Sequence, residues 1–207
     1  MRHDKDLRYY PSSMRHDLFS TPVWHLEGTP QELVDELYKG AYRFKKEHPS
    51  YEVTNYGGYQ SPPFTLEKFH PQGIEYIKAI VTQLFAKEDS TSAPLTAIEF
   101  PPICDFKVES WWYNINGQGH WNVPHIHAGS DLALVLYVTD SDGLLNLMSP
   151  NPMRLLDSED YGGEGDHMRV NANKGDILIF PSDLVHYVMP NPKEEDRISI
   201  SMNLQLC

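Results

Sequence analysis

The sequence predicts a mainly β protein with flanking α-helices, and three observations lead to this class. Two segments in the first half of the chain carry apolar residues at helical spacing. From residue 98 onward the pattern changes to short apolar or alternating runs separated by turns, which is typical of a β-sandwich or barrel. The length of 207 residues suits one domain over 1–207, with the β core at 98–207.

The two helices are expected over 30–47 and 72–86, where one face of each segment is apolar. The first has a start signal in which Thr29 can cap the helix, Pro30 suits its first position and Glu32 completes a capping box. We expect both helices to pack on one sheet of the β core.

The strands are predicted from short runs of apolar residues, or from alternation with a period of two. Residues 1–17 are polar and aperiodic, so we expect a loose N-terminal arm there. An acidic, Gly-rich segment at 158–166 is a candidate mobile flap. The expected strands are 18–26, 106–115, 132–139, 144–148, 168–170, 177–180 and 198–206.

The last predicted strand alternates between two kinds of side chain. One side carries the apolar residues Ile198, Ile200, Met202 and Leu204. The other side carries Arg197, Ser199, Ser201, Asn203 and Gln205. On a one-sided strand the polar row faces water, whereas in a barrel with a polar pocket it faces the site. The pattern leaves both arrangements open.

The composition excludes several classes of partner. With 17 basic and 29 acidic residues, the net charge of −12 argues against binding to nucleic-acid backbones or anionic membrane surfaces. Cys104 and Cys207 are the only cysteines, which fits a reducing compartment. We expect no signal peptide and no membrane span. The expected location is therefore the cytoplasm, or the host cytoplasm if the protein is viral.

Three histidines and one arginine form the main candidate site. His125 and His127 stand at positions i and i+2 beside one strand, where side chains share a face. His186 follows a second apolar run, and Arg197 comes soon after it. Neutral imidazoles suit iron, zinc, copper or nickel. Three imidazoles with a nearby cation are what a mononuclear iron site with an anionic cosubstrate needs.

A family resemblance covers most of the chain, and its core runs from Trp112 to Asn203. This segment resembles the iron(II)/2-oxoglutarate-dependent oxygenases, and more closely those of phages and marine bacteria. The matching stretches are Leu18-Phe19-Ser20-Thr21-Pro22, Asn55-Tyr56-Gly57-Gly58-Tyr59-Gln60-Ser61, His125-Ile126-His127-Ala128-Gly129-Ser130, Val135-Leu136-Tyr137-Val138, Gly175 to Pro181, His186 and Arg197-Ile198-Ser199. The resemblance implies a double-stranded β-helix (jelly-roll, cupin-like) core, with Fe(II) and 2-oxoglutarate as cofactors.

The resemblance also implies roles for individual residues. His125 resembles the first metal ligand and His186 the last. Arg197 resembles the residue that pairs with the far carboxylate of 2-oxoglutarate, and a planar guanidinium suits this because it binds a carboxylate through two hydrogen bonds. Ser199 lies on the same strand face and could add a hydroxyl. The plainer interpretation of Arg197 is a surface charge beside the acidic residues 194–196.

The second ligand departs from the wider family, which has a carboxylate where this chain has His127. Three imidazoles leave the Fe²⁺ charge uncompensated by the protein, and a dianionic cosubstrate could balance it. The alternative is that His127 points away and that Asp131 or Asp183 supplies an oxygen. We favour His127 because it shares a face with His125.

The strand before the histidines offers further candidates. Trp112 and Asn114 share one face, and Trp111 and Tyr113 share the other. One face is expected to line the cosubstrate pocket, with Tyr113 or Asn114 hydrogen-bonding a carboxylate. Core packing is the plainer interpretation of the tryptophans.

The function implied by the resemblance is hydroxylation of an unknown substrate, a peptide or a small molecule, with dioxygen and 2-oxoglutarate. The runner-up is a cupin-type metal protein, either a 3-His dioxygenase or an isomerase without 2-oxoglutarate. A third hypothesis is a non-catalytic, metal-stabilised binding module. Arg197 and Ser199 favour the oxygenase, since a plain cupin needs neither. His120, in a turn, is a candidate substrate contact, and His167 is a weaker candidate.

Overall fold

The computed structural model describes residues 21–87, 106–150 and 167–207, with backbone alone for 83–87. The predicted arm at 1–17, the start of the core at 98–105 and the predicted flap at 158–166 lie outside the described residues. Within the described parts, no helix is long and apolar enough to cross a lipid bilayer.

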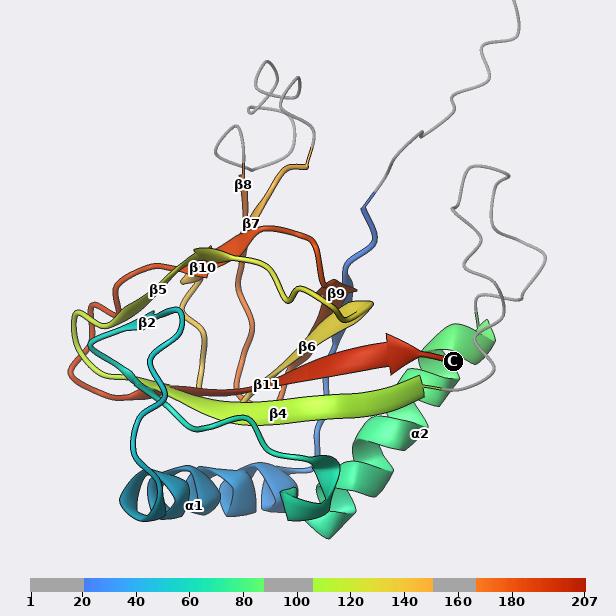
Figure 1. Cartoon of the computed structure of the whole chain (residues 1–207), viewed down its shortest axis with the longest axis horizontal. Helices are drawn as coiled ribbons and strands as arrows, with labels where there is room; N and C mark the ends of the chain where they lie inside the picture. Colours follow the sequence, from blue (N-terminus) through green and yellow to red (C-terminus); the bar gives the residue numbers. More distant parts are fainter. Residues whose placement is uncertain (1–20, 88–105, 151–166) are drawn as a thin grey trace, which may run out of the picture.

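Two antiparallel sheets face each other (Figure 1). The six-stranded major sheet has the order β1-β9-β6-β11-β4-β3 and the five-stranded minor sheet has the order β2-β5-β10-β7-β8. The major-sheet strands are β1 (Trp24–Leu26), β3 (Tyr59–Gln60), β4 (Phe106–Asn116), β6 (Leu132–Tyr137), β9 (Ile177–Pro181) and β11 (Arg197–Leu206). The minor-sheet strands are β2 (Asn55–Tyr56), β5 (Trp121–His125), β7 (Leu145–Met148), β8 (His167–Val170) and β10 (His186–Val188).

Two helices, α1 (Gln31–Glu47) and α2 (Pro71–Lys87), cover the outer face of the major sheet, and a short 3₁₀ turn, η1 (Leu66–Lys68), precedes α2. The helices expected at 30–47 and 72–86 are therefore confirmed. The capping box is wrong. Pro30 is the N-cap and no side chain caps the helix. The backbone N–H of Thr29 instead donates to the carbonyl oxygen of Gly175, so a tertiary contact holds the start of α1.

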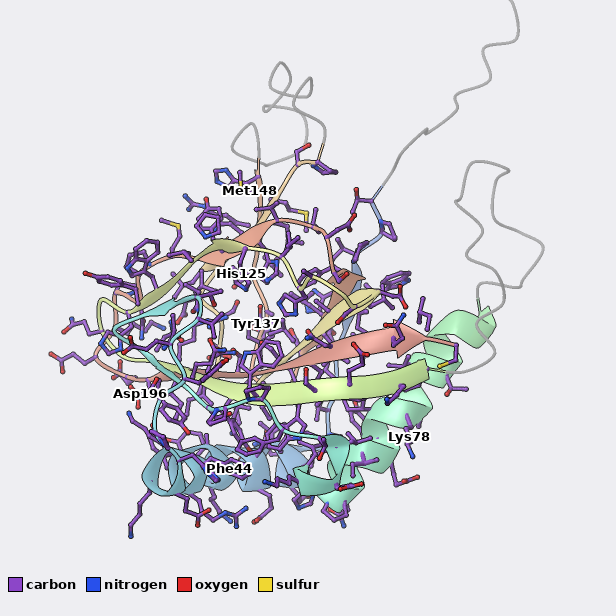
Figure 2. All side chains as sticks on the ribbon, viewed as in Figure 1. Phe44, Lys78, His125, Tyr137, Met148 and Asp196 are labelled. Atoms are coloured by element: carbon purple, nitrogen blue, oxygen red, sulfur yellow. The ribbon has the colours of Figure 1, made fainter. Side chains whose placement is uncertain are left out.

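Two apolar cores lie on opposite faces of the major sheet. The first packs the helices against one face and includes Leu37, Ile77 and Ile200. The second lies between the sheets and includes Phe180 and Leu145. Figure 2 shows Phe44 on the helix side, and His125 and Tyr137 between the two sheets. All six residues of β6 are buried, as expected for a strand that is covered on both faces.

This arrangement shows which way each face of the alternating strand β11 points. Its apolar row faces the helices, where Ile198, Ile200, Met202 and Leu204 are fully buried. Its polar row faces the space between the sheets, where Arg197, Ser199 and Ser201 line a pocket. These three polar side chains are themselves buried. The first three residues of the polar row therefore point into a site and not into bulk water.

Candidate metal centre

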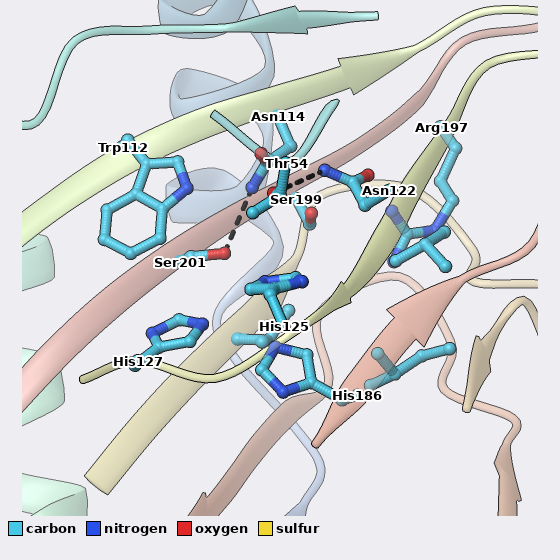
Figure 3. A pocket seen from close by; sticks show the side chains of 13 residues that line it. Thr54, Trp112, Asn114, Asn122, His125, His127, His186, Arg197, Ser199 and Ser201 are labelled. Carbon is cyan, nitrogen blue, oxygen red and sulfur yellow. Dashed lines mark hydrogen bonds between the residues drawn. The ribbon is translucent and has the colours of Figure 1, made fainter. Parts of the chain in front are cut away.

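The three predicted histidines meet at one end of the space between the sheets (Figure 3). His125 ends β5 and His186 begins β10, and the two are directly paired in the antiparallel ladder. His127 lies two residues beyond the end of β5, where its backbone N–H donates to the carbonyl oxygen of Ser182. One ring nitrogen from each histidine lies within 4.8 Å of the other two.

Each imidazole makes a hydrogen bond through Nδ1. The acceptor is the carbonyl oxygen of Val123 for His125, at 2.7 Å, and that of Leu184 for His186, at 2.9 Å. For His127 it is the amide oxygen Oδ1 of Asn203, at 2.6 Å. Because these oxygens accept, Nδ1 carries the proton in each ring and Nε2 keeps its lone pair. The cluster is therefore set up to bind a metal through three Nε2 atoms.

Burial keeps the imidazoles neutral. Desolvation lowers the pKa of His127 to about 4 and that of His186 to about 3, and it also lowers the pKa of His125. Neutral imidazole is the form that ligates metals, so the cluster is ready to bind at neutral pH. The described residues place no carboxylate in this cluster.

The histidines open onto a pocket that both sheets line, with a volume of about 380 Å³ including solvent at its mouth. Arg197 lies at the other end of the pocket from His127 (Figure 3). Two hydrogen bonds order its polar wall. Asn114 donates to the hydroxyl of Ser201 at 3.0 Å, and Asn122 donates to that of Thr54 at 3.3 Å.

Arg197 is only 4% exposed, which rules out the interpretation as a surface charge beside 194–196. Its side chain forms no ion pair within the described part of the chain, and its Nε has no hydrogen-bond partner. The guanidinium lies 5.5 Å from the ring centre of Tyr137 and interacts with its buried hydroxyl, which makes no hydrogen bond of good geometry within the described residues. A buried unpaired cation costs several kcal/mol. This end of the pocket therefore suits an anion that accepts from both groups.

The residues predicted to bind the cosubstrate lie on two different faces of the major sheet. Ser199 is paired with Asn114 on β4 and with Tyr137 on β6, so all three share the face that looks into the space between the sheets. The role predicted for Tyr113 is wrong. It is paired with Ile200 and belongs to the helix-side core, where its hydroxyl would lie 2.6 Å from a Cβ added at Gly40. Desolvation raises the pKa of Tyr113.

The alternative carboxylate ligands do not reach the cluster. Asp131 is exposed, and its carboxylate accepts hydrogen bonds from the side chain of Gln205 and the backbone of Leu206 at the end of β11. Asp183 is exposed in the turn before His186. His120 also lies outside the cluster, in a turn that its Nδ1 closes by accepting from the backbone N–H of Gly117. His167, at the start of β8, is not part of the cluster either.

Sequence reasoning did not assign a role to several residues of the site. Asn203 stands in the polar row of β11, so its face was predictable although its contact with His127 was not. Tyr137 lies in a continuous apolar run with no period, which carries no signal for a site residue. Thr54 reaches the pocket from the bend before β2, and Asn122 reaches it from β5.

Comparisons with known proteins agree with this geometry. A family model described as "Putative 2OG-Fe(II) oxygenase" matches residues 110–203, a stretch that contains every pocket-lining residue except Thr54. No curated protein matches the chain. The finer likeness to oxygenases of phages and marine bacteria is not addressed by these comparisons and stays a prediction.

Solved structures share the fold. A prolyl-4-hydroxylase from Pseudomonas putida aligns with a TM-score of 0.60 at 17% identity, over 92% of this chain and 96% of its own. The viral collagen prolyl hydroxylase of Paramecium Bursaria Chlorella virus-1, crystallised with 2-oxoglutarate, gives 0.59 at 12% identity, over 89% and 96%. HygX from Streptomyces hygroscopicus, with nickel and 2-oxoglutarate bound, gives 0.53 at 14% identity, over 90% and 83%. The chain therefore has the double-stranded β-helix fold, and its residues 110–203 are similar to the 2OG-Fe(II) oxygenase family.

Proposed function

We propose that this protein is an Fe(II)- and 2-oxoglutarate-dependent oxygenase that hydroxylates a peptide or small-molecule substrate. The observation that carries the proposal is one pocket with a cluster of neutral imidazoles at one end and, at the other, a buried arginine that has no acidic partner among the described residues. The histidine cluster alone, or the buried arginine alone, would also fit other functions. Together they fit a metal and a dianion that spans the distance between them.

In this proposal His125, His127 and His186 hold the iron through Nε2. Their Nδ1 protons are already engaged with oxygen acceptors, which orients the rings without a metal. Because all three ligands are neutral, the protein leaves the charge of Fe²⁺ uncompensated. A dianionic cosubstrate would supply that compensation, so a cluster that contains no carboxylate from the described residues favours an anionic partner.

Arg197 would hold the far carboxylate of 2-oxoglutarate. The fit rests on groups without partners: the Nε of Arg197 and the hydroxyl of Tyr137 are both buried and unsatisfied. A carboxylate between them would accept from both, and Ser199, on the same face, could add a third donor. Burial raises the pKa of Tyr137 to about 12, so its hydroxyl stays a donor at neutral pH.

The rest of the pocket would orient the cosubstrate and limit access of water. Iron with 2-oxoglutarate supplies oxidative decarboxylation of the cosubstrate by dioxygen, coupled to hydroxylation of a C–H bond. The chain's own residues shape the cavity in which this takes place. Trp112 packs beside His127, with ring centres 5.4 Å apart, and Val135, Leu145 and Val188 add apolar lining. Asn114 remains a candidate cosubstrate contact through its free amide oxygen.

The substrate class is proposed from neighbours of low identity. A prolyl hydroxylase from Trichoplax adhaerens was crystallised with a peptide fragment, and HygX with hygromycin B. Both a peptide and a small molecule therefore fit this fold. The proposed location is the cytoplasm, which rests on the low cysteine content.

A cupin-type 3-His dioxygenase is the second candidate, and one observation favours it. Among the described residues the cluster holds three histidines and lacks the carboxylate that the wider oxygenase family has. Such an enzyme would have no use for a buried unpaired Arg197, which is why the oxygenase fits better.

The test is anaerobic titration of the Fe(II)-loaded protein with 2-oxoglutarate, followed by visible absorption. A metal-to-ligand charge-transfer band is expected, because bidentate chelation of Fe(II) by 2-oxoglutarate produces one. The amount of succinate formed after oxygen is added measures turnover of 2-oxoglutarate. The matched control is Arg197→Met, which should bind Fe(II) and need more 2-oxoglutarate. Bound iron with no band would contradict the proposal and favour the cupin or a metal-stabilised binding module.

A further inference from the structure

The three imidazoles of the cluster are not held in the same way. His125 and His186 each bond to a backbone carbonyl two residues earlier in the chain. His127 bonds instead to a side chain, the amide of Asn203, which lies on β11 and 76 residues away in the chain. The residue that departs from the wider family is thus the one whose orientation depends on a distant side chain.

The two kinds of partner differ in what they permit. A backbone carbonyl can only accept, so the Nδ1 of His125 and of His186 must carry the proton. A side-chain amide has an accepting oxygen and a donating NH₂ that exchange places when the group turns over. With the oxygen toward His127, Nε2 keeps its lone pair. With the NH₂ toward it, the ring proton moves to Nε2, and the ring cannot bind a metal.

The surroundings of His127 hold the ring and leave the amide free to turn. The ring packs against Trp112, and the backbone N–H donates to the carbonyl oxygen of Ser182 at 2.8 Å. The side chain of Asn203 makes no hydrogen bond within the described residues other than the one to His127. It also stands where the pairing of β11 with β4 changes register. The position of the His127 ring is therefore fixed, while the amide of Asn203 determines which ring nitrogen carries the proton.

We propose that Asn203 is a positioning residue whose amide orientation decides whether His127 can act as a metal ligand. The inference rests on the proposed metal centre and adds a residue that does not touch the metal. Metal binding selects the orientation with the oxygen toward the ring. Any change that removes this acceptor weakens the third ligand and leaves the other two as they are.

The experiment is anaerobic titration with Co(II), a spectroscopic probe for Fe(II), of the wild type and two variants. Asn203→Leu removes the acceptor, and its Co(II) dissociation constant should rise about 10- to 100-fold with a changed d–d spectrum. Asn203→Asp keeps an acceptor that cannot turn into a donor, so it should bind Co(II) at least as tightly as the wild type. Gln205→Leu is the control, since it breaks a neighbouring bond to Asp131 without contacting His127.

A second readout needs no metal. Long-range ¹H–¹⁵N NMR reports which ring nitrogen of His127 carries the proton. Asn203→Asp should show the proton on Nδ1. Asn203→Leu should shift it toward Nε2, the form that free histidine prefers in water. Should the leucine variant not fold, as judged by near-UV circular dichroism, Asn203→Ala replaces it with the same expectation.

The outcomes separate the two proposals. If wild-type protein binds neither Co(II) nor Fe(II), the proposed metal centre is wrong. If wild type binds and Asn203→Leu binds equally well with an unchanged tautomer, the role of Asn203 is wrong. Equal weakening in the aspartate and leucine variants would also contradict it, because the shape of the amide would then matter and its acceptor would not.

Discussion

The two faces of β11 are both buried from Arg197 to Met202, yet they differ in almost every other respect. The helix-facing row is apolar and fully buried in the first core. The row that faces the minor sheet carries a buried cation, two buried hydroxyls and an amide, and it borders the pocket. One strand thus supplies stability from one face and a binding site from the other.

The difference shows how a buried polar row indicates function. Each fully buried aliphatic side chain of the apolar row contributes roughly 1.5–3 kcal/mol to folding. Burial of polar groups costs free energy unless they find partners, and Arg197 has no acidic partner within the described residues. A protein can tolerate this free-energy cost where a bound ligand offsets it. Four substitutions separate the two faces, and they are given from the largest expected effect to the smallest.

The polar face of β11 can bind 2-oxoglutarate as proposed only if the histidines opposite it bind a metal. His186→Ala removes one of the three ligand rings, so we expect Fe(II) binding to be lost and, with it, the charge-transfer band with 2-oxoglutarate. Equilibrium dialysis with metal analysis measures this. The control is His48→Ala, because His48 packs against Phe44 and Phe64 on the helix side. Retained Fe(II) binding in the His186 variant would place the metal elsewhere.

The apolar face should control stability and leave binding alone. Ile200→Ala creates a cavity in the first core and should lower the free energy of unfolding by about 2–5 kcal/mol. Urea denaturation of the metal-free protein measures the loss. The dissociation constant of 2-oxoglutarate for the folded, Fe(II)-loaded variant should stay at the wild-type value. A large change in that constant would show that the two faces are coupled.

Arg197→Met should have the opposite effect. Loss of a charged hydrogen-bond donor should weaken 2-oxoglutarate by about 10- to 100-fold, since such bonds contribute about 1.5–3 kcal/mol. Fe(II) should still bind. Because the charge is buried without an acidic partner, the metal-free variant should be as stable as the wild type or more so. Calorimetric titration and a thermal melt measure the two effects, and full 2-oxoglutarate affinity would refute the assigned role.

Ser199→Ala should give the smallest effect. A single neutral hydroxyl donor is worth about 1 kcal/mol, which corresponds to roughly a fivefold loss of 2-oxoglutarate affinity. Charge-transfer titration of the Fe(II)-loaded variant measures it, and Ser182→Ala is the control, since the hydroxyl of Ser182 donates to the backbone of Ser130 away from Arg197. An equal loss in both variants would mean that the effect is structural and not specific to the carboxylate.

Local pattern predicted the helices and the longer strands, because periodicity acts over a few neighbours, whereas the short strands β2, β3, β5 and β10 were not predicted. The helices at 30–47 and 72–86 follow from the spacing of apolar residues and the strand at 132–139 from a continuous apolar run, and the structure has helices and a strand there. The start of α1 was predicted less well. Thr29 has the residue type of a cap, but its backbone bonds to Gly175, a partner far away in the chain.

The sequence by itself determined which residues share a strand face, and it therefore placed Arg197 with Ser199, and Trp112 with Asn114. It also singled out the three histidines, since their spacing and residue type are local properties. Only the tertiary structure decided which face of each strand looks into the pocket. For this reason Tyr113 lies outside the candidate site, whereas Tyr137 and Asn203 belong to it. The reason is physical: alternation sets relative direction along one strand, whereas the absolute direction depends on which layer the helices cover.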